Sequence, residues 1–521
     1  MVVCPHALAS AVGLGVLQQG GHAVDAAIAL NAALGVVYPH MTGLGGDSFW
    51  LIYSAATQQV YGLNGSGRAG QQVNRERFHR QGLQAIPPRG AQAVLTVPGA
   101  VAAWGQAHQR FGRLPWAQLL QPAIDLARQG YPVSASQGYW TRRNQENFTR
   151  FSEAPLPFLP GGRVPPVGTW LTNPDLAKSL ESLAEGGPEV FYRGNLAQRI
   201  VDDLTGRGGW LTREDFVAHA STWVDPISTT YRGFQVYQLP PNTQGFTVLQ
   251  MLNLIEPFDL GHLGHGTADY YHLLVEATKL AYADRDRWLS DPAFVDIPLP
   301  DLISKTYADG RRARLRMDLA QPYAAVARGG DTTYSAVVDA EGNIVSALQS
   351  LYFDFGAAVV PPGLGFALHN RGALFALDSQ AANCLAPGKR PFHTLIPALV
   401  RHRNGRPYLA LGTMGGEGQP QTQLALLTRL LDFGFDPQTA IDLPRWLWGR
   451  TWGESATGLT LEGRIPNPIR QDLRARGHRV KVVPDWTDLM GHAHVLRLDP
   501  TGPALEGGSD PRSDGVALGL D

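Results

Sequence analysis

The segment RGGDTTYSAVVDAEGNIVSALQSLYFDFG, residues 328–356, constrains the fold more than any other part of the chain. Two apolar runs flank Glu341-Gly342-Asn343, which is a pattern typical of a β-hairpin. Thr332 and Thr333 stand at the head of the first predicted strand, directly after Asp331. Helix patterns dominate before this point and strand patterns dominate after it. We therefore expect a mixed α+β protein with a boundary between Asp331 and Thr332.

Apolar residues recur at helical spacing in several segments before the boundary. The predicted helices span residues 6–19, 23–37, 114–130 and 267–289, and strands are predicted within 48–63 and 406–416. The pair Gly20-Gly21 separates the first two helices as a stop signal. The last predicted strand, RPYLALGTMGG, runs directly into two glycines.

The overall composition narrows the class of protein. The 521 residues carry a net charge of −1, which does not favour binding to nucleic acid or to an anionic membrane. Cys4 and Cys384 form neither a disulfide framework nor a zinc motif, and such sparse cysteine usage suits a reducing compartment. Residues 26–37, the longest apolar run, are too short to span a bilayer, and no signal peptide is recognised. We expect a cytoplasmic protein.

Glycine-rich segments raise the question of a cofactor. Residues 65–70, GSGRAG, match G-x-G-x-x-G, but the acid that a dinucleotide site needs about 20 residues later is missing. Gly415-Gly416 allow two interpretations, an oxyanion site formed by backbone N–H groups or a tight turn. The sequence also lacks H-E-x-x-H and any clustered set of histidines and acids. We expect neither a metal nor a cofactor.

Thr332 also allows two interpretations. Threonine favours strands, so Thr332 is explained by its position alone. Alternatively, the chain is cut before Thr332, and the freed α-amine serves as the base that activates the threonine hydroxyl. A serine hydrolase elbow, G-x-S-x-G, is not found.

Several blocks together resemble the γ-glutamyltransferase family, which contains self-cleaving N-terminal-nucleophile hydrolases. The blocks are GGHAVDAAIALNAALGVVYPHMTGLGGDSFWLIY (20–53), VEATKLAYADRDRWLSDP (275–292), DTTYSAVVDAEGN (331–343), PGKRPFHTLIPALV (387–400), LGTMGGEG (411–418) and GGSDPRSDG (507–515). Their order along the chain matches the order in the family. The resemblance implies an αββα four-layer sandwich, built from a helix-rich large subunit, 1–331, and a strand-rich small subunit, 332–521.

The resemblance also implies roles for individual residues. Thr332 would be the nucleophile and the new amino terminus, with Asp331 as the last residue of the large subunit. Thr333 would assist the amine, and Ser350 would support the nucleophile. Gly415 and Gly416 match the oxyanion pair of the family. The two subunits would form a heterodimer, and further dimerisation is left open.

Substrate-binding positions depart from the family pattern. Ser66 takes the place of an arginine that binds the substrate carboxylate, and Arg68 follows two residues later. On a strand, this shift would keep Arg68 on the same face and within reach of a carboxylate. An ordinary surface arginine is the alternative interpretation.

The block LHNRGALF, residues 368–375, departs further. Asn370 is kept, whereas Arg371 replaces a glutamine and Leu374 replaces the acid that binds the substrate amine. In the next block His393 and Thr394 stand where the family carries paired serines. We expect substrate contacts from Arg68, Asn370, Arg371, His393 and Thr394.

These departures leave the substrate open between two classes of small amide. One is a γ-glutamyl amide such as glutathione, and the other is a carboxylate-bearing amide without an α-amine, oxamate-like or glutaryl-like. The segment 375–390 is shorter than in members with a lid loop, which favours water over an amine acceptor. The chain in this respect resembles a lidless, cytoplasmic subgroup that includes oxamate amidohydrolase. An uncleaved, non-catalytic relative is the third alternative.

Overall fold

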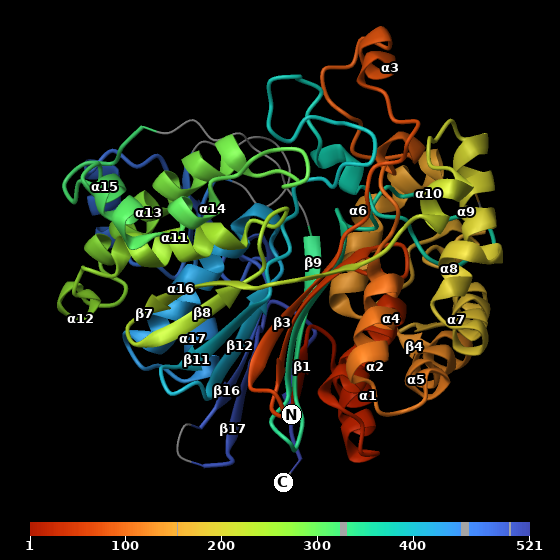
Figure 1. Cartoon of the computed structure of the whole chain (residues 1–521), viewed down its shortest axis with the longest axis horizontal. Helices are drawn as coiled ribbons and strands as arrows, with labels where there is room; N and C mark the ends of the chain where they lie inside the picture. Colours follow the sequence, from red (N-terminus) through yellow and green to blue (C-terminus); the bar gives the residue numbers. More distant parts are fainter. Residues whose placement is uncertain (154, 323–330, 450–457, 500–501, 521) are drawn as a thin grey trace.

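Two β-sheets are stacked face to face and lie between two layers of helices (Figure 1). The computed structural model describes residues 1–521 except 154, 323–330, 450–457, 500–501 and 521, and it describes only the backbone of Asp331. This arrangement confirms the predicted αββα sandwich. The boundary between residues 331 and 332 falls at the head of a central strand, between the two helix layers.

The first sheet is antiparallel throughout and has seven strands. In spatial order they are β18 (Val516–Leu518), β1 (Val2–Cys4), β9 (Asp331–Val338), β10 (Ile344–Tyr352), β2 (Asp47–Ser54), β3 (Gln59–Gly65) and β6 (Thr222–Val224). Strands β9 and β10 form the predicted hairpin, with Ile344 opposite Val338. The hairpin lies between β1 and β2, which come from the amino-terminal part of the chain.

The second sheet has six antiparallel strands. In spatial order they are β17 (Leu505–Ser509), β16 (Ala493–Leu498), β12 (Pro407–Thr413), β11 (Ala398–His402), β8 (Phe234–Gln238) and β7 (Ile227–Tyr231). Two small sheets add β13 (Trp446–Trp448), β14 (Leu459–Glu462) and β15 (Val480–Val483), and β4 (Tyr131–Pro132) with β5 (Trp170–Leu171). The predicted strand at 406–416 is β12.

Helices cover both outer faces. On the side of the first sheet lie α1 (Ala7–Gln18), α2 (Ala23–Val37), α4 (Ala100–Phe111), α5 (Trp116–Gln129), α6 (Ala135–Phe151), α7 (Pro174–Gly186), α8 (Glu189–Arg193), α9 (Asn195–Gly206) and α10 (Arg213–Val217), with α3 (Arg75–Arg80) at one end. On the other side lie α11 (Gly245–Ile255), α12 (Leu260–Leu263), α13 (Ala268–Trp288), α14 (Leu299–Leu302), α15 (Lys305–Arg312), α16 (Gln419–Leu431), α17 (Pro437–Asp442) and α18 (Asn467–Ala475). The four predicted helices correspond to α1, α2, α5 and α13.

The central strands are apolar on both faces because both faces are covered. One face of β9 contributes Ala336 and Val338 to the core between the sheets. The opposite face contributes Val337 to the core under the first helix layer. Helix α2 is buried along its whole length, and its alanines allow the sheet to approach closely. The sandwich therefore packs β9 on both of its faces.

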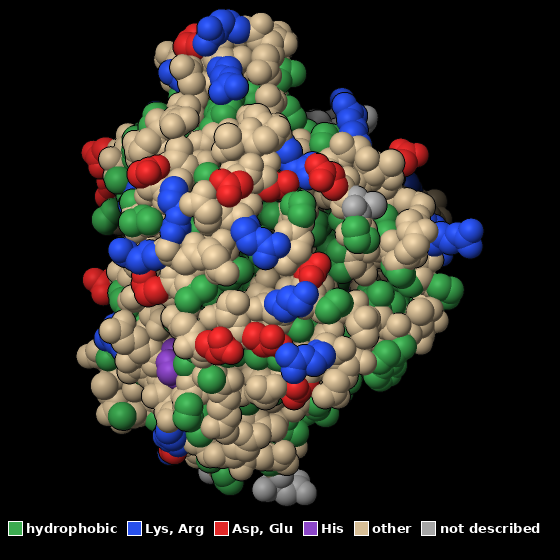
Figure 2. All heavy atoms as spheres, turned by 90° about the vertical axis from the view of Figure 1, so that its right-hand side faces the viewer, with side chains coloured by type: hydrophobic (Ala, Val, Ile, Leu, Met, Phe, Trp, Pro, Cys, Tyr) green, Lys and Arg blue, Asp and Glu red, His purple; other side chains and the backbone are tan. Residues whose placement is uncertain are grey.

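The surface carries mixed charge. On the face formed by the first helix layer, basic and acidic side chains are interspersed (Figure 2). Within the described ranges, no helix combines the length and the apolar character needed to cross a bilayer.

Candidate active site

Thr332 lies at the head of β9 and is almost completely buried. Its Oγ1 donates a hydrogen bond of 3.3 Å to Ser350 Oγ and accepts one of 3.4 Å from Gln419 Nε2. Thr333 donates through Oγ1 to the backbone carbonyl of Gln349, at 3.0 Å. The structure thus brings Thr332 and Ser350 together, whereas the hydroxyl of Thr333 is tied to the neighbouring strand.

Arg371 completes this hydrogen-bonded group. It lies in the short 3₁₀ helix η3 (Arg371–Leu374) and is fully buried. Its Nη2 donates to Ser350 Oγ at 3.0 Å, its Nη1 donates to Thr394 Oγ1 at 3.2 Å, and its guanidinium carbon lies 4.5 Å from the centre of the Tyr352 ring. Burial lowers the pKa of Arg371 to about 10, so the side chain stays charged at neutral pH.

A buried acid lies near Arg371. Asp47 lies directly across from Ser350 on the neighbouring strand β2. Its Oδ1 accepts from the N–H groups of Gly99 and Gly67, at 3.1 and 3.3 Å, and its Oδ2 lies 3.1 Å from His393 Nε2. Burial raises the pKa of Asp47 to about 7, although the charge of Arg371 works against this rise. His393, which was expected to contact the substrate, therefore contacts the buried Asp47.

Gly415 and Gly416 follow β12 and open the 3₁₀ helix η4 (Gly416–Gly418). Their φ angles are 128° and 50°, which only glycine adopts without strain. The carbonyl of Gly415 accepts from the N–H of Gly418 at 2.7 Å, and that of Gly416 accepts from Gln244 Nε2 at 3.0 Å. The carbonyl of Gly415 shares a peptide plane with the N–H of Gly416, so its bond to Gly418 fixes the orientation of that N–H group.

An apolar cluster lines the position of Leu374. The cluster consists of Phe246, Leu289, Leu302, Tyr352, Leu374 and Phe392. Leu374 is fully buried in it. The surroundings of this residue thus contain hydrocarbon where the family pattern places an amine-binding acid.

The side chains of Arg68 and Asn370 form hydrogen bonds with residues outside the group around Thr332. Strand β3 ends at Gly65, so the expectation that Ser66 and Arg68 share a strand face is wrong. Ser66 is buried, whereas the Arg68 side chain is 46% exposed and pairs with Asp291 at 3.1 Å and with the carbonyl of Gly388. Asn370 is buried, where it donates to Pro88 O and accepts from the N–H of Phe353.

Sequence reasoning missed three participants in this site. Asp47 lies within the block 20–53, which carries the family resemblance, but no role was assigned to it. Gln419 follows Gly415-Gly416 by three residues, and Gln244 lies far away in sequence. Only the pairing of β2 with β10 and the packing of α11 (Gly245–Ile255) bring Asp47 and Gln244 to the site.

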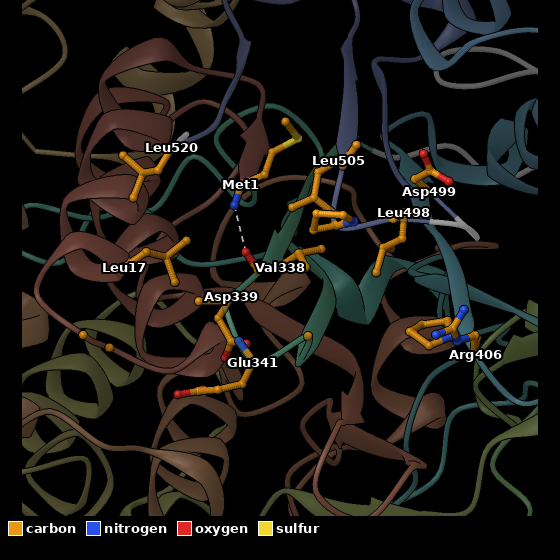
Figure 3. Close-up of a pocket in the computed structure, with 18 of the residues that line it drawn as sticks. Met1, Leu17, Val338, Asp339, Glu341, Arg406, Leu498, Asp499, Leu505 and Leu520 are labelled. Atoms are coloured by element: carbon orange, nitrogen blue, oxygen red, sulfur yellow. Dashed lines mark hydrogen bonds between the residues drawn. The ribbon is translucent and has the colours of Figure 1, made fainter.

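Two other features of the molecule lie outside this site. Side-chain atoms of His272, Glu276 and His478 come within 4.8 Å of one another, a spacing that could hold a metal. Each is already paired, because the two histidines bond at 2.8 Å and Glu276 bonds to Lys279 at 2.6 Å. A cavity of about 710 Å³, lined by Val338 and Glu341 among others, opens at the other end of β9 (Figure 3).

Comparison with known proteins places this chain in a family. The sequence profile of the gamma-glutamyltranspeptidase family matches residues 9–520. The chain belongs to this family. Among its relatives, the glutathione hydrolase-like YwrD proenzyme of Bacillus subtilis is 49% identical, over 100% of this chain and 98% of the relative. The oxamate amidohydrolase proenzyme of Klebsiella pneumoniae is 41% identical, over 100% and 98%.

Solved structures agree with the family assignment. The cephalosporin acylase of Bacillus halodurans superposes with a TM-score of 0.93 at 38% identity, over 100% of this gamma-glutamyltranspeptidase-family chain and 95% of the acylase. The αββα sandwich predicted from the sequence is therefore the fold of a hydrolase family with solved members. The chain is an enzyme of this family. Several of its relatives are proenzymes, which is relevant to the expected cleavage of the Asp331–Thr332 bond.

Proposed function

We propose that this protein is a self-cleaving amidohydrolase that recognises the acyl group of its substrate through a carboxylate and without an α-ammonium group. The observation that carries this proposal is the pairing of buried Arg371 with the nucleophile group, next to apolar Leu374. A guanidinium binds a carboxylate well and repels an ammonium group. Among the described residues, the bonds to Ser350 and Thr394 use two of its five N–H groups.

In the proposed maturation step, Thr332 Oγ1 attacks the carbonyl carbon of Asp331, and the acyl group moves from the nitrogen of Thr332 to its oxygen. Water then hydrolyses this ester, which leaves chains 1–331 and 332–521. The new α-amine of Thr332 takes the proton of the hydroxyl in later turnovers. Thr332 is nearly inaccessible in the continuous chain, which supports the need for this step before a substrate binds.

In the proposed turnover, Thr332 Oγ1 attacks the amide carbonyl of the substrate. The N–H groups of Gly415 and Gly416 stabilise the oxyanion, the amine leaves with a proton, and an ester with Thr332 remains. Water attacks this ester and releases the acid. Ser350 holds the nucleophile oxygen through its 3.3 Å hydrogen bond during both steps.

Distances favour a short acyl group. Two hydrogen bonds of 3.3 and 3.0 Å share Ser350 Oγ, so Arg371 Nη2 lies no more than about 6.3 Å from Thr332 Oγ1. A carboxylate bonded directly to the scissile carbonyl, as in oxamate, is about 1.5 Å from it and reaches Arg371 without folding. A glutaryl or γ-glutamyl chain has four carbon–carbon bonds to cross and must bend back to reach the same group.

The segment 375–390 supports hydrolysis rather than transfer to an amine. Asn383 stabilises this segment, because it donates to the carbonyl of Leu374 and accepts from the N–H of Phe392. Lys389 and Ser290 both donate to the carbonyl of Ala382. A short segment held in this way leaves the acyl-enzyme open to water.

Hydrolysis of γ-glutamyl amides is the second candidate function. It is favoured by the relative that is 49% identical and is named glutathione hydrolase-like. It would need an ammonium partner other than Leu374. The two candidates are distinguished by measuring hydrolysis of oxamate, a glutaryl anilide, a γ-glutamyl anilide and glutathione by the same preparation.

Faster hydrolysis of the amine-free substrates supports the first candidate, and a strong preference for γ-glutamyl contradicts it. A denaturing gel of the same preparation tests the cleavage step. The parent protein should give two chains, the smaller beginning Thr-Thr-Tyr-Ser, whereas Thr332→Ala should stay whole. A single uncut chain with full activity would contradict the nucleophile assignment.

A further inference from the structure

The turn that carries Gly415 and Gly416 is held by its own backbone and also by side chains from elsewhere in the chain. Both residues have positive φ angles and lack a side chain that would restrict the backbone. A peptide plane between such residues turns over easily, and an N–H group that points away from the site stabilises no oxyanion. The bond from Gly418 to the carbonyl of Gly415 fixes the peptide before Gly416. The carbonyl of Gly416 accepts from the N–H of Gln419 within the turn and also from a side chain from elsewhere in the chain.

That side chain is Gln244, the residue that precedes α11. Its Nε2 donates to the carbonyl of Gly416 at 3.0 Å and to the carbonyl of Thr394 at 3.1 Å. Gln244 is fully buried, so water does not compete for these bonds. One amide group thus links the oxyanion turn to the residue whose hydroxyl accepts from Arg371.

Arg285 on α13 determines which way the Gln244 amide points. Its Nη1 donates to Gln244 Oε1 at 3.2 Å. Because arginine has only donors, the atom facing Arg285 must be the amide oxygen, and the NH₂ group must face the two carbonyls. Arg285 also pairs with Glu417 at 2.8 Å, directly after the glycines. The same guanidinium therefore supports the turn at two successive residues.

We propose that Gln244, held by Arg285, is a positioning residue that keeps the Gly415–Gly416 turn in its oxyanion-binding orientation. This inference rests on the proposed function. Gln244 and Arg285 precede Thr332 in sequence, whereas the glycines follow it. Residues 1–331 would thus complete the oxyanion site of 332–521 across the proposed cut, without touching the substrate.

Two substitutions test this role. Gln244→Glu keeps the shape and the bond to Arg285 but turns the donor into an oxygen that repels both carbonyls. Gln244→Met removes the polar group with little change in length. Direct loss of an oxyanion donor lowers kcat by about 10²- to 10³-fold, so loss of its support should lower kcat by about 10- to 100-fold with KM within about two-fold. Inhibition by boric acid, which forms a tetrahedral adduct with a hydroxyl, should weaken in parallel.

Gln137→Glu is the matched control. Gln137 is also fully buried and donates through Nε2, but to Tyr131 in the helix layer of the first sheet. It reports the general effect of placing a carboxylate in the core. Parent turnover is measured first with the fastest substrate of the panel, since its absence contradicts the proposed function itself. If the parent turns over and both Gln244 variants match it in kcat and in boric acid inhibition, the positioning role is refuted.

Discussion

Leu374→Asp would restore an acid where the family pattern has one, and its effects follow from the position of Leu374. The residue is fully buried among Tyr352, Phe392 and other apolar side chains. Loss of a buried leucine side chain costs about 1.5–3 kcal/mol of folding free energy, and burial of a carboxylate adds to this cost. The variant should therefore melt at a lower temperature than the parent.

The informative quantity is the ratio of kcat/KM for a γ-glutamyl anilide to kcat/KM for a glutaryl anilide. An ammonium group that gains a charged hydrogen bond binds more tightly by about 1.5–3 kcal/mol, or about 10- to 150-fold in kcat/KM. Leu374→Asp should raise kcat/KM for a γ-glutamyl anilide, relative to a glutaryl anilide, by this factor. The glutaryl group lacks only the amine, so other effects of the substitution cancel.

Leu374→Asn provides the control, because it removes the same apolar surface without adding a charge. Both variants are assayed with both anilides at a pH above the range in which carboxyl groups titrate. If the ratio for Leu374→Asp equals that for Leu374→Asn, Leu374 does not face the acyl group. The argument from its apolar surroundings to the substrate class would then be wrong.

Three further outcomes are expected. Arg371→Met should lower kcat/KM for oxamate by roughly 30- to 1000-fold, from the loss of about 2–4 kcal/mol, and an unchanged value would contradict carboxylate binding there. Arg68→Ala should change kcat/KM by less than about three-fold, because exposed ion pairs contribute little, and a larger loss would show that Arg68 reaches the substrate. Asp47→Asn should gain stability relative to the parent as pH rises from 4 to 7. The raised pKa of Asp47, about 7, means that the parent loses about 4 kcal/mol of unfolding free energy over this window. A difference in unfolding free energy between the two proteins that does not change with pH would refute the assignment.

Local sequence patterns predicted the framework of this fold well. The hairpin around Gly342 and the helices at 23–37 and 267–289 depend on apolar spacing and turn residues that are adjacent in sequence. The order of strands in the sheets depends on pairings between distant segments, such as β1 with β9. Those pairings were not predicted, because the resemblance to a family implied only the layered architecture.

The candidate site also contains some features that local sequence patterns predict and others that depend on distant segments. Thr332 and Ser350 lie on the two strands of one hairpin, so their proximity follows from a local pattern. Arg68 illustrates the limit, because its expected orientation assumed that β3 continues to residue 68, whereas the strand ends at Gly65. The proximity of Asp47 to Arg371 was also inaccessible, since the two residues lie more than 300 positions apart in sequence.

The position of the β9–β10 hairpin has a consequence for how the two proposed chains stay together. Hydrogen bonds join β9 to β1 on one side and β10 to β2 on the other, and β11 pairs with β8 in the second sheet. Two chains interleaved in this way share their hydrophobic cores and do not meet across a separable surface. The uncut peptide keeps the two halves at a high effective concentration while they fold, an advantage that separately synthesised halves lack. Once formed, the pair should not dissociate on dilution, and it should lose its structure in one cooperative transition.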